Sequence, residues 1–378
     1  MLRRRLRLRL LFGVLCACVV PHSGHGQVTT VEGASVIVFP RIIVDGTWDT
    51  VIQISNTASR PAYAHCFYVN GALTDPGLPP GPANPPLWTQ TDFAIVLPQR
   101  QQPTHWVVST GRLDNPNDVA CRFAGQAKPC DPQTSGTDHA DCCDSGYDPG
   151  NVPPVVSGFT GELRCIEEDA SGAPWSGNAL VGFATLTHLA SGEVVKYPAI
   201  GLPGYETNDA DGTLCLGGAS RDGCAHGAEY GSCPQTWVLS HPSDYDERAV
   251  DGDARATAIT VVPCGENFVT QTPSPQTLQF RVTNEFEQSF SAATTITCWA
   301  SLRLSDVNAV FQRASQGGEW AQTQVRAPPG TPGGFLVVQQ SEHDTAEPAT
   351  SAFAGMVPAH IGVDADGAAI VLPTEVLQ

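Results

Sequence analysis

Two stretches of this chain echo each other, and such an internal echo restricts the possible architecture more than composition does. The first reads TDFAIVLPQRQQPTHW (91–106) and the second SDVNAVFQRASQGGEW (305–320). Each begins with a hydroxyl residue and Asp, continues through an apolar run and a Gln-Arg pair, and ends at Trp. The segments around them keep one order in both halves: an apolar run closed by proline, an alternating run ending at Asn, and a Cys beside an aromatic residue. This shared order indicates a tandem duplication.

The repeated segments are short, and several alternate with the period of a β-strand. In LQFRVT, Leu278, Phe280 and Val282 point to one side and the polar residues between them to the other. Turn dipeptides separate the runs, and no helix longer than two turns is indicated. We therefore expect an all-β fold of two tandem antiparallel β-sandwich (Ig-like) domains from an internal duplication, with Cys-rich and Pro-rich loop insertions. Trp106 and Trp320 hold equivalent places and are predicted to be core anchors.

The same pattern predicts a domain division along the 378 residues. Ligand contacts are expected in the inserted loops, since loops on a rigid scaffold usually carry function. The predicted units are a signal peptide (1–26), a first sandwich (27–202) with a Pro-rich loop (71–88) and a Cys-rich insertion (114–157), a Cys-containing loop and linker (203–256), and a second sandwich (257–378).

The N-terminus has the layout of a secretory signal peptide. MLRRRLRLRL is basic, LLFGVLCACVV is apolar but short, and small residues in PHSGHGQ suit cleavage after Gly26. Two alternatives are an N-terminal membrane anchor and a lipoprotein attached through Cys18, because Leu15 lies three residues before it. We expect a secreted, periplasmic or cell-envelope protein with no integral membrane segment after cleavage.

The chain is strongly acidic, with a net charge of −18, and loss of the arginine-rich leader makes it more so. Such a surface repels nucleic acid, so no nucleic-acid partner is expected. It attracts divalent cations and basic partners. The expected partner is a protein or a glycan.

Cysteine usage agrees with an oxidising compartment and predicts disulfides rather than zinc, because no close C-x2-C pairs exist. We expect Cys66 to pair with Cys165 and Cys264 with Cys298, since each pair lies in strand-like runs of one half. The four cysteines of the insertion are expected to pair among themselves. Eleven cysteines follow the predicted signal peptide, and because this number is odd, at least one of them has no partner within the chain. The disulfide candidates are Cys66, Cys121, Cys130, Cys142, Cys143, Cys165, Cys215, Cys224, Cys233, Cys264 and Cys298.

The best candidate for a metal site is NDADG, where Asn208, Asp209 and Asp211 resemble the first half of a calcium loop. The distal Glu of such a loop is absent, and a β-turn is the alternative; DADG (364–367) is shorter still. His139 lies among aspartates in TDHADCCD, which favours a solvated loop over a cation site. Calcium is the one cofactor considered.

No sequence motif points to an enzyme: GxSxG, HExxH and the P-loop are all missing. A dispersed Ser-His-Asp triad stays open, because triads are defined by geometry, and His65, His105 and His188 lie on or beside predicted strands. The alternatives to a non-enzymatic protein are a secreted hydrolase with a site at the domain junction and a carbohydrate-binding module. For the module, Trp88, Trp175 and Trp237 lie in loop contexts where they could stack on sugars.

Several longer stretches also resemble a known group. VFPRIIVDGTWDTVIQISNT, HCFYVNG, TDFAIVLPQRQQPTHW, GFTGELRC and FRVTNEFEQSFS are similar to a family of exported bacterial β-rich proteins with no assigned activity. The resemblance implies export and a β-rich build, and it carries over no catalytic residue. The expectation is an exported non-enzymatic surface, envelope or extracellular component that binds a ligand or builds structure.

Overall fold

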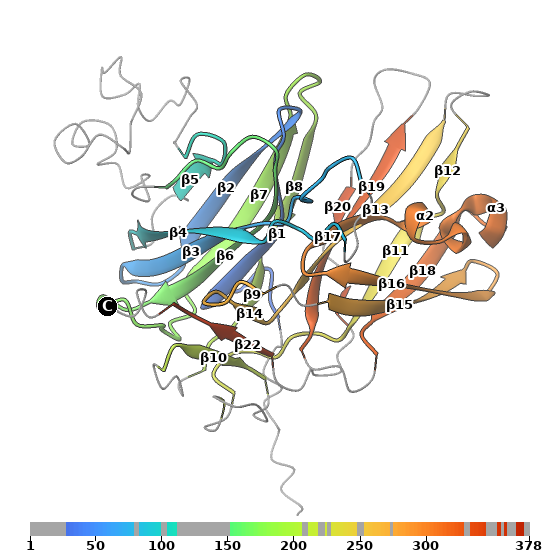
Figure 1. Ribbon diagram of the computed structural model, residues 1–378. Helices are drawn as coiled ribbons and strands as arrows, with labels where there is room; N and C mark the ends of the chain where they lie inside the picture. Colours follow the sequence, from blue (N-terminus) through green and yellow to red (C-terminus); the bar gives the residue numbers. More distant parts are fainter. Residues whose placement is uncertain are drawn as a thin grey trace, which may run out of the picture.

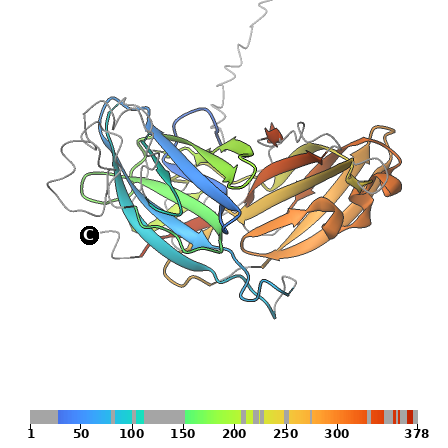
Figure 2. The same cartoon turned by 90° about the horizontal axis from the view of Figure 1, so that it is seen from above.

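The computed structural model describes residues 28–78, 83–99, 104–111, 152–205, 211–217, 224, 228–247, 253–272, 275–328, 333–344, 354–356, 359–360 and 368–373. Within these ranges the strands form five small sheets (Figures 1 and 2). The expected all-β class is therefore correct. The prediction of two tandem Ig-like β-sandwich domains is wrong, because the fold is organised as a five-blade β-propeller of small sheets.

Two sheets are built almost wholly from the first half of the chain. In the first, β1 is buried along nearly its whole length, and its sequence VIVFPRIIV is apolar except for Arg41, which suits a strand covered on both faces. Its register with β6 shifts between Phe39 and Ile42, around Pro40, which has no N–H to donate. The first sheet has the order β4 (Thr89–Leu97), β3 (Ala62–Asn70), β6 (Phe159–Glu168), β1 (Val36–Val44), β9 (Ile200–Leu202). The second has the order β5 (Thr104–Val107), β2 (Trp48–Asn56), β7 (Leu180–His188), β8 (Val194–Pro198).

Two further sheets come mainly from the second half. In the third sheet, β15 and β18 alternate buried apolar and outward polar residues, as one-sided antiparallel strands do. The third sheet has the order β16 (Ser289–Thr297), β15 (Pro275–Asn284), β18 (Trp320–Arg326), β11 (Thr236–Pro242), β21 (Ala359–His360). The fourth has the order β12 (Tyr245–Asp246), β13 (Ala254–Pro263), β19 (Phe335–Asp344), β20 (Ala354–Met356), with β17 (Ala300–Arg303) also paired to β13.

The fifth sheet joins segments that were predicted to belong to different parts of the chain, the linker and the second sandwich. It has the order β10 (Thr213–Leu216), β22 (Ala368–Val371), β14 (Glu266–Asn267). Thus β10 comes from the predicted linker and its partners from the predicted second sandwich. Phe268, which follows β14, stacks on Phe67 of β3 with ring centroids 4.0 Å apart. Periodicity identifies strands but not their partners, and here the partners are far apart in sequence.

The echoed stretches do not adopt the same structure. TDFAIVL (91–97) lies in β4, whereas SDVNAVF (305–311) forms the short helix α2 (Leu304–Val307) and the 3-10 turn η3 (Ala309–Phe311), followed by α3 (Arg313–Gln316). Trp106 is buried, but Trp320 is 54% exposed at the start of β18. The prediction that Trp320 is a core anchor is therefore wrong. Its neighbour Ala321 takes the inward position of the strand instead.

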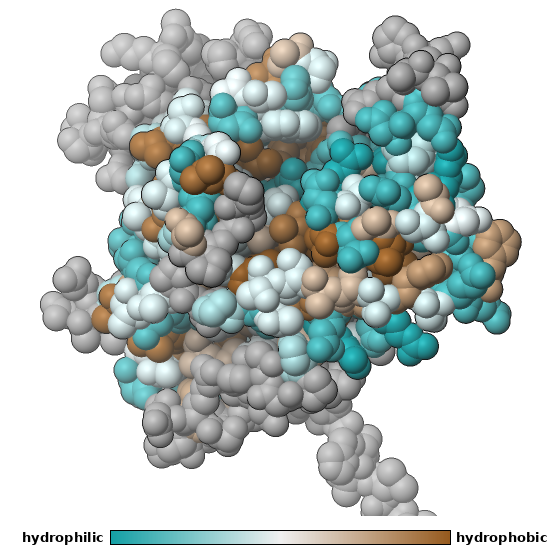
Figure 3. Space-filling view, turned by 45° about the vertical axis from the view of Figure 1, so that its right-hand side comes forward, coloured by the Kyte–Doolittle hydropathy of each residue, from teal (hydrophilic) through white to brown (hydrophobic). Residues whose placement is uncertain are grey.

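Buried apolar residues from both halves form one continuous core. At the junction, Trp299 donates its indole N–H to the Pro40 carbonyl at 2.7 Å, tying the second half to β1. On the side of the molecule drawn in Figure 3, apolar residues gather in a band across the middle, with hydrophilic surface on either side. No helix in the described ranges is long and apolar enough to cross a membrane.

Candidate functional site

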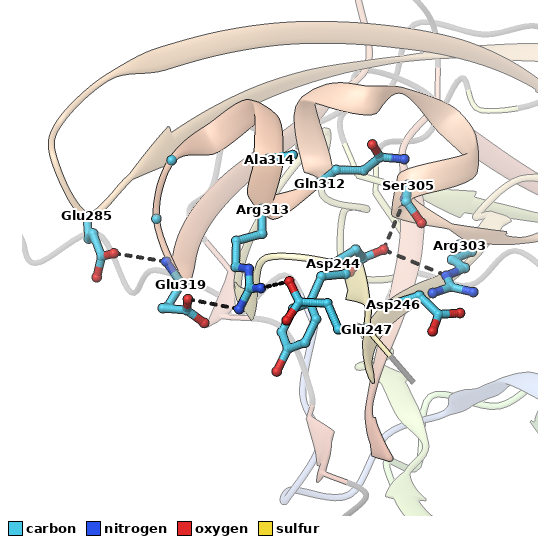
Figure 4. A pocket seen from close by; sticks show the side chains of 13 residues that line it. Asp244, Asp246, Glu247, Glu285, Arg303, Ser305, Gln312, Arg313, Ala314 and Glu319 are labelled. Carbon is cyan, nitrogen blue, oxygen red and sulfur yellow. Dashed lines mark hydrogen bonds and ion pairs between the residues drawn. The ribbon is translucent and has the colours of Figure 1, made fainter. Parts of the chain in front are cut away.

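A hollow in the second half lies where β12, the start of α2 and the end of α3 meet (Figure 4). Its volume is about 720 Å³. Gly317 ends α3 in a left-handed conformation with a φ of 70°, which glycine adopts without strain. A Cβ on Gly318 would lie 2.8 Å from a Glu285 carboxylate oxygen, so glycine there lets the loop and that side chain approach closely. The lining residues are Asp244, Tyr245, Asp246, Glu247, Glu285, Arg303, Ser305, Gln312, Arg313, Ala314, Gly317, Gly318 and Glu319.

Asp244 forms the buried back of this pocket. Its carboxylate accepts hydrogen bonds from the backbone N–H groups of Thr257 at 2.8 Å and Ser305 at 3.1 Å. Arg303 lies 3.9 Å from the same carboxylate, and burial raises the pKa of Asp244 to about 6. These contacts hold β13, β12 and the first turn of α2 together. Asp244 is therefore a structural support of the pocket wall.

Arg313 crosses the mouth of the pocket. It forms ion pairs with Glu247 and with Glu319, and its guanidinium lies 4.0 Å from the centroid of the Tyr245 ring. The pairing with Glu247 raises the pKa of Arg313 above its ordinary value. Arg255 approaches Glu319 at 3.5 Å. Figure 4 shows the Arg313 side chain between the two glutamates.

Acidic groups outnumber cations around the hollow. Five carboxylates line it against the two guanidiniums of Arg303 and Arg313. Asp246 and Glu285 are exposed, and Glu285 accepts a hydrogen bond from the Glu319 backbone N–H at 2.9 Å. An open, negatively charged recess of this kind attracts a positively charged group. No cluster of metal-ligating side chains occurs within the described residues.

This pocket was not evident from the sequence, although Asp244, Asp246 and Glu247 lie within the predicted Cys-containing loop and linker (203–256). The acidic run SDYDE (243–247) was the available signal. Arg313 and Glu319 come from the second echo, where nothing in the sequence indicated that the chain would turn back toward this run.

Of the three residues of the calcium candidate, Asp211 lies within the described ranges. Asn208 and Asp209 lie outside the described residues, as do His139 and DADG (364–367). The Asp211 carboxylate accepts the backbone N–H of Thr213 at 2.7 Å, the geometry of an Asx turn. Calcium binding there stays a prediction.

The three histidines considered for a triad lie on three different strands, β3, β5 and β7. His65 Nε2 lies 3.0 Å from Asp92, and its Nδ1 lies 3.5 Å from Glu168. His188 Nδ1 accepts the Ser191 backbone N–H at 3.1 Å, which closes the turn after β7. His105 stands on β5, paired with Gln53 of β2. These contacts assign local structural roles to His65 and His188.

A buried ion pair lies at the junction where a hydrolase site was expected. Arg164 and Glu162 are completely buried and form an ion pair at 3.0 Å. Arg164 also donates to the carbonyl oxygens of Cys264 at 2.6 Å and Pro263 at 2.9 Å. Burial raises the pKa of Glu162, and Arg164 opposes that rise. This fully buried pair links the two halves, although the Arg164 Nε has no hydrogen-bond partner among the described residues.

The tryptophans proposed for sugar stacking are mostly buried. Trp237 is 1% exposed and donates to the Phe335 carbonyl, and Trp88 is 3% exposed. Trp175 is 45% exposed, with the Arg60 guanidinium 5.7 Å from its ring centroid. Of these three, only Trp175 presents substantial aromatic surface to solvent.

Three disulfides are present among the described cysteines: Cys66–Cys165, Cys215–Cys224 and Cys233–Cys264. The first is the expected pairing, and it joins directly opposed residues of β3 and β6. The expected Cys264–Cys298 bond is wrong, because Cys264 pairs with Cys233 and Cys298 is a buried thiol. Cys121, Cys130, Cys142 and Cys143 lie outside the described residues.

Comparison with known proteins adds little to this geometry. No family model matches the chain, and no curated protein matches it. The resemblance to a family of exported bacterial proteins therefore gains no support. Among solved structures, one described as "Crystal Structure of Thermotoga maritima 1070" aligns with 9% identity and a TM-score of 0.24, covering 34% of this chain and 96% of that chain.

Proposed function

We propose that the protein is an exported, non-enzymatic binding component, and that the acidic pocket receives a positively charged group of its partner. The excess of carboxylates around an open recess carries this proposal. A guanidinium or ammonium group would pair with the exposed carboxylates of Glu285 and Asp246, because Glu247 and the Tyr245 ring are already in contact with Arg313.

Export is supported by the basic-apolar N-terminal sequence and by the three disulfides, which are typical of oxidising compartments. A binding role is supported over catalysis by the state of the pocket side chains. Asp244 is held by backbone N–H groups, and Glu247 and Glu319 are paired with Arg313. These groups are arranged to stabilise one another and a cation rather than to activate a nucleophile.

The test is isothermal titration of the whole oxidised protein with a short oligo-arginine peptide. We expect binding that weakens with salt, and a several-fold loss of affinity in both Glu285→Gln and Asp246→Asn. Glu193→Gln removes an equal charge from a residue that does not line the pocket and serves as the matched control. Equal affinity for the pocket variants and the control contradicts the proposal, as does the absence of binding at low salt.

A further inference from the structure

The outer face of the third sheet differs from the rest of this acidic protein. Alternate residues of β18 and β15 point away from the core, among them Trp320, Gln322, Gln324 and Arg326 on β18 and Gln279 and Arg281 on β15. The outward positions of β16 are serine, alanine and threonine. We call this surface the polar sheet face. Its opposite side carries Leu278, Phe280 and Val325, which are buried in the core.

The charge of the polar sheet face is opposite to that of the whole chain. No Asp or Glu occupies an outward position on β16, β15 or β18, although the chain has 38 acidic residues and a net charge of −18. The two charged groups on the face are Arg281 and Arg326, both exposed. Among the described residues, Arg281 forms no ion pair, so its guanidinium is available to an external anion.

The strand register places the two guanidiniums near each other. Arg326 lies opposite Gln279 and Arg281 lies opposite Gln324, so the arginines are diagonal neighbours on adjacent strands, roughly 7–8 Å apart at the backbone. The Arg326 Nε donates to Gln279 at 3.1 Å, which orients its side chain along the face. A hollow of about 710 Å³ is lined by Arg281, Arg326, Gln279 and Ser291, among others. The arrangement offers two forked donors with amide and hydroxyl groups between them.

An aromatic surface stands at one end of the same row. Trp320 is 54% exposed and is the first residue of β18, where it pairs with Pro242 of β11. An exposed indole presents a flat apolar surface with a polar edge, which suits the face of a sugar ring. The row along β18 therefore runs from an aromatic platform through two glutamines to an arginine.

We propose that the polar sheet face binds a polysaccharide that carries carboxylate groups, with Arg281 and Arg326 binding the carboxylates and Trp320 stacking on a sugar ring. Charge complementarity selects an anionic chain, and the glutamine, serine and threonine side chains match its hydroxyl groups. Nucleic acid fits less well, because two arginines neutralise few phosphates on a protein of strong negative charge. This surface borders the acidic pocket at Trp320, which follows Glu319, but its two arginines lie farther along β15 and β18 and suit a ligand of opposite charge.

The experiment measures binding of the whole protein to polygalacturonate and to the same polymer after reduction of its carboxyl groups, by affinity electrophoresis and titration calorimetry. We expect binding to polygalacturonate alone, weakened as NaCl rises from about 0.05 to about 0.5 M. Arg281→Gln and Arg326→Gln should each lower the affinity about 10-fold or more, and Trp320→Ala several-fold. All three positions are on the surface, so folding should be little affected.

Lys196→Gln removes one positive charge from β8, away from the polar sheet face, and is the matched control. Equal affinity of the control and the two arginine variants overturns the proposal. Equal binding of the reduced polymer, absence of binding by the unaltered protein, or equally tight binding of single-stranded DNA does so as well. Asp246→Asn, a change in the acidic pocket on β12 of the fourth sheet, should leave polygalacturonate binding unchanged, so the two proposals are tested independently.

Discussion

The indole N–H of Trp88 donates a 2.9 Å hydrogen bond to the carboxylate of Glu266, a residue 178 positions later in the chain. Both side chains are buried, and Glu266 belongs to the fifth sheet, which packs on the first. Beside them Gln90 donates to the Phe268 carbonyl at 3.0 Å. The loop before β4 is thus attached to the second half of the chain by side-chain contacts.

Trp88→Phe should destabilise the protein by about 1–3 kcal/mol, because the change removes the donor and leaves a buried carboxylate without it. Glu266→Gln keeps an acceptor and should cost less. Denaturant unfolding followed by circular dichroism measures both. Trp175→Phe, at a largely exposed position, is the control and should shift stability by less than about 0.5 kcal/mol. A Trp88→Phe variant as stable as this control contradicts the assigned role.

The buried carboxyls make folding stability depend on pH. Burial raises the pKa of Glu168 from 4.5 to about 8 and that of Glu266 to about 7. Asp169 adds to the rise at Glu168, and Arg164 opposes it at Glu266. At a pH between the pKa of a carboxyl in the unfolded chain and its higher pKa in the folded state, the folded protein keeps a proton that the unfolded chain has released. Stability is therefore greatest at the acid end of this window and falls as pH rises through the folded pKa values.

His241 acts in the opposite direction at lower pH. Burial lowers its pKa from 6.5 to about 4, so folding loses stability as pH falls through that range. The carboxyl effect is therefore best measured above pH ~6.5. The Tm should fall from pH ~6.5 to ~8.5, and Glu168→Gln should flatten that slope. A slope that is unchanged in Glu168→Gln shows that this carboxyl titrates normally.

Asp244→Ala should destabilise the protein by about 2–3 kcal/mol, since two backbone N–H groups lose their acceptor and Arg303 loses its ion-pair partner in the pocket wall. Asp246→Ala, an exposed change in the same segment, should stay within about 0.5 kcal/mol of the unaltered protein. Chemical denaturation of the two variants side by side makes the comparison. Similar losses in both would mean that Asp244 does not hold the α2 turn.

The disulfides should rank by the length of chain they enclose. Cys66–Cys165 spans 99 residues, Cys233–Cys264 spans 31 and Cys215–Cys224 spans 9. Removing each pair with alanines should cost about 4–5, 3–4 and 2–3 kcal/mol respectively in the chain-entropy model. Unfolding of the three double variants tests the order, and a non-reducing peptide map tests the pairing. A peptide linking Cys264 to Cys298 would contradict the structure.

Some features of this protein follow from local sequence. The alternation in LQFRVT correctly indicates strand β15 and its inward residues, because side chains on a strand alternate between faces. The positions of Cys66 and Cys165 in strand-like runs indicated their bond. The excess of acids indicated a negatively charged surface, although its distribution was not evident.

Long-range pairing decided the rest. Sequence similarity between the two echoes did not make them alike in structure: one is β4, and the other folds into α2, η3 and α3 and brings Arg313 to Glu247. Cys264 bonds Cys233 because β13 ends beside the segment before β11, a proximity with no local signature. Strand propensity and alternation act over a few residues, whereas partner choice depends on how entire faces are buried. The acidic pocket and the polar sheet face each combine residues from separate strands, so only the folded chain defines them.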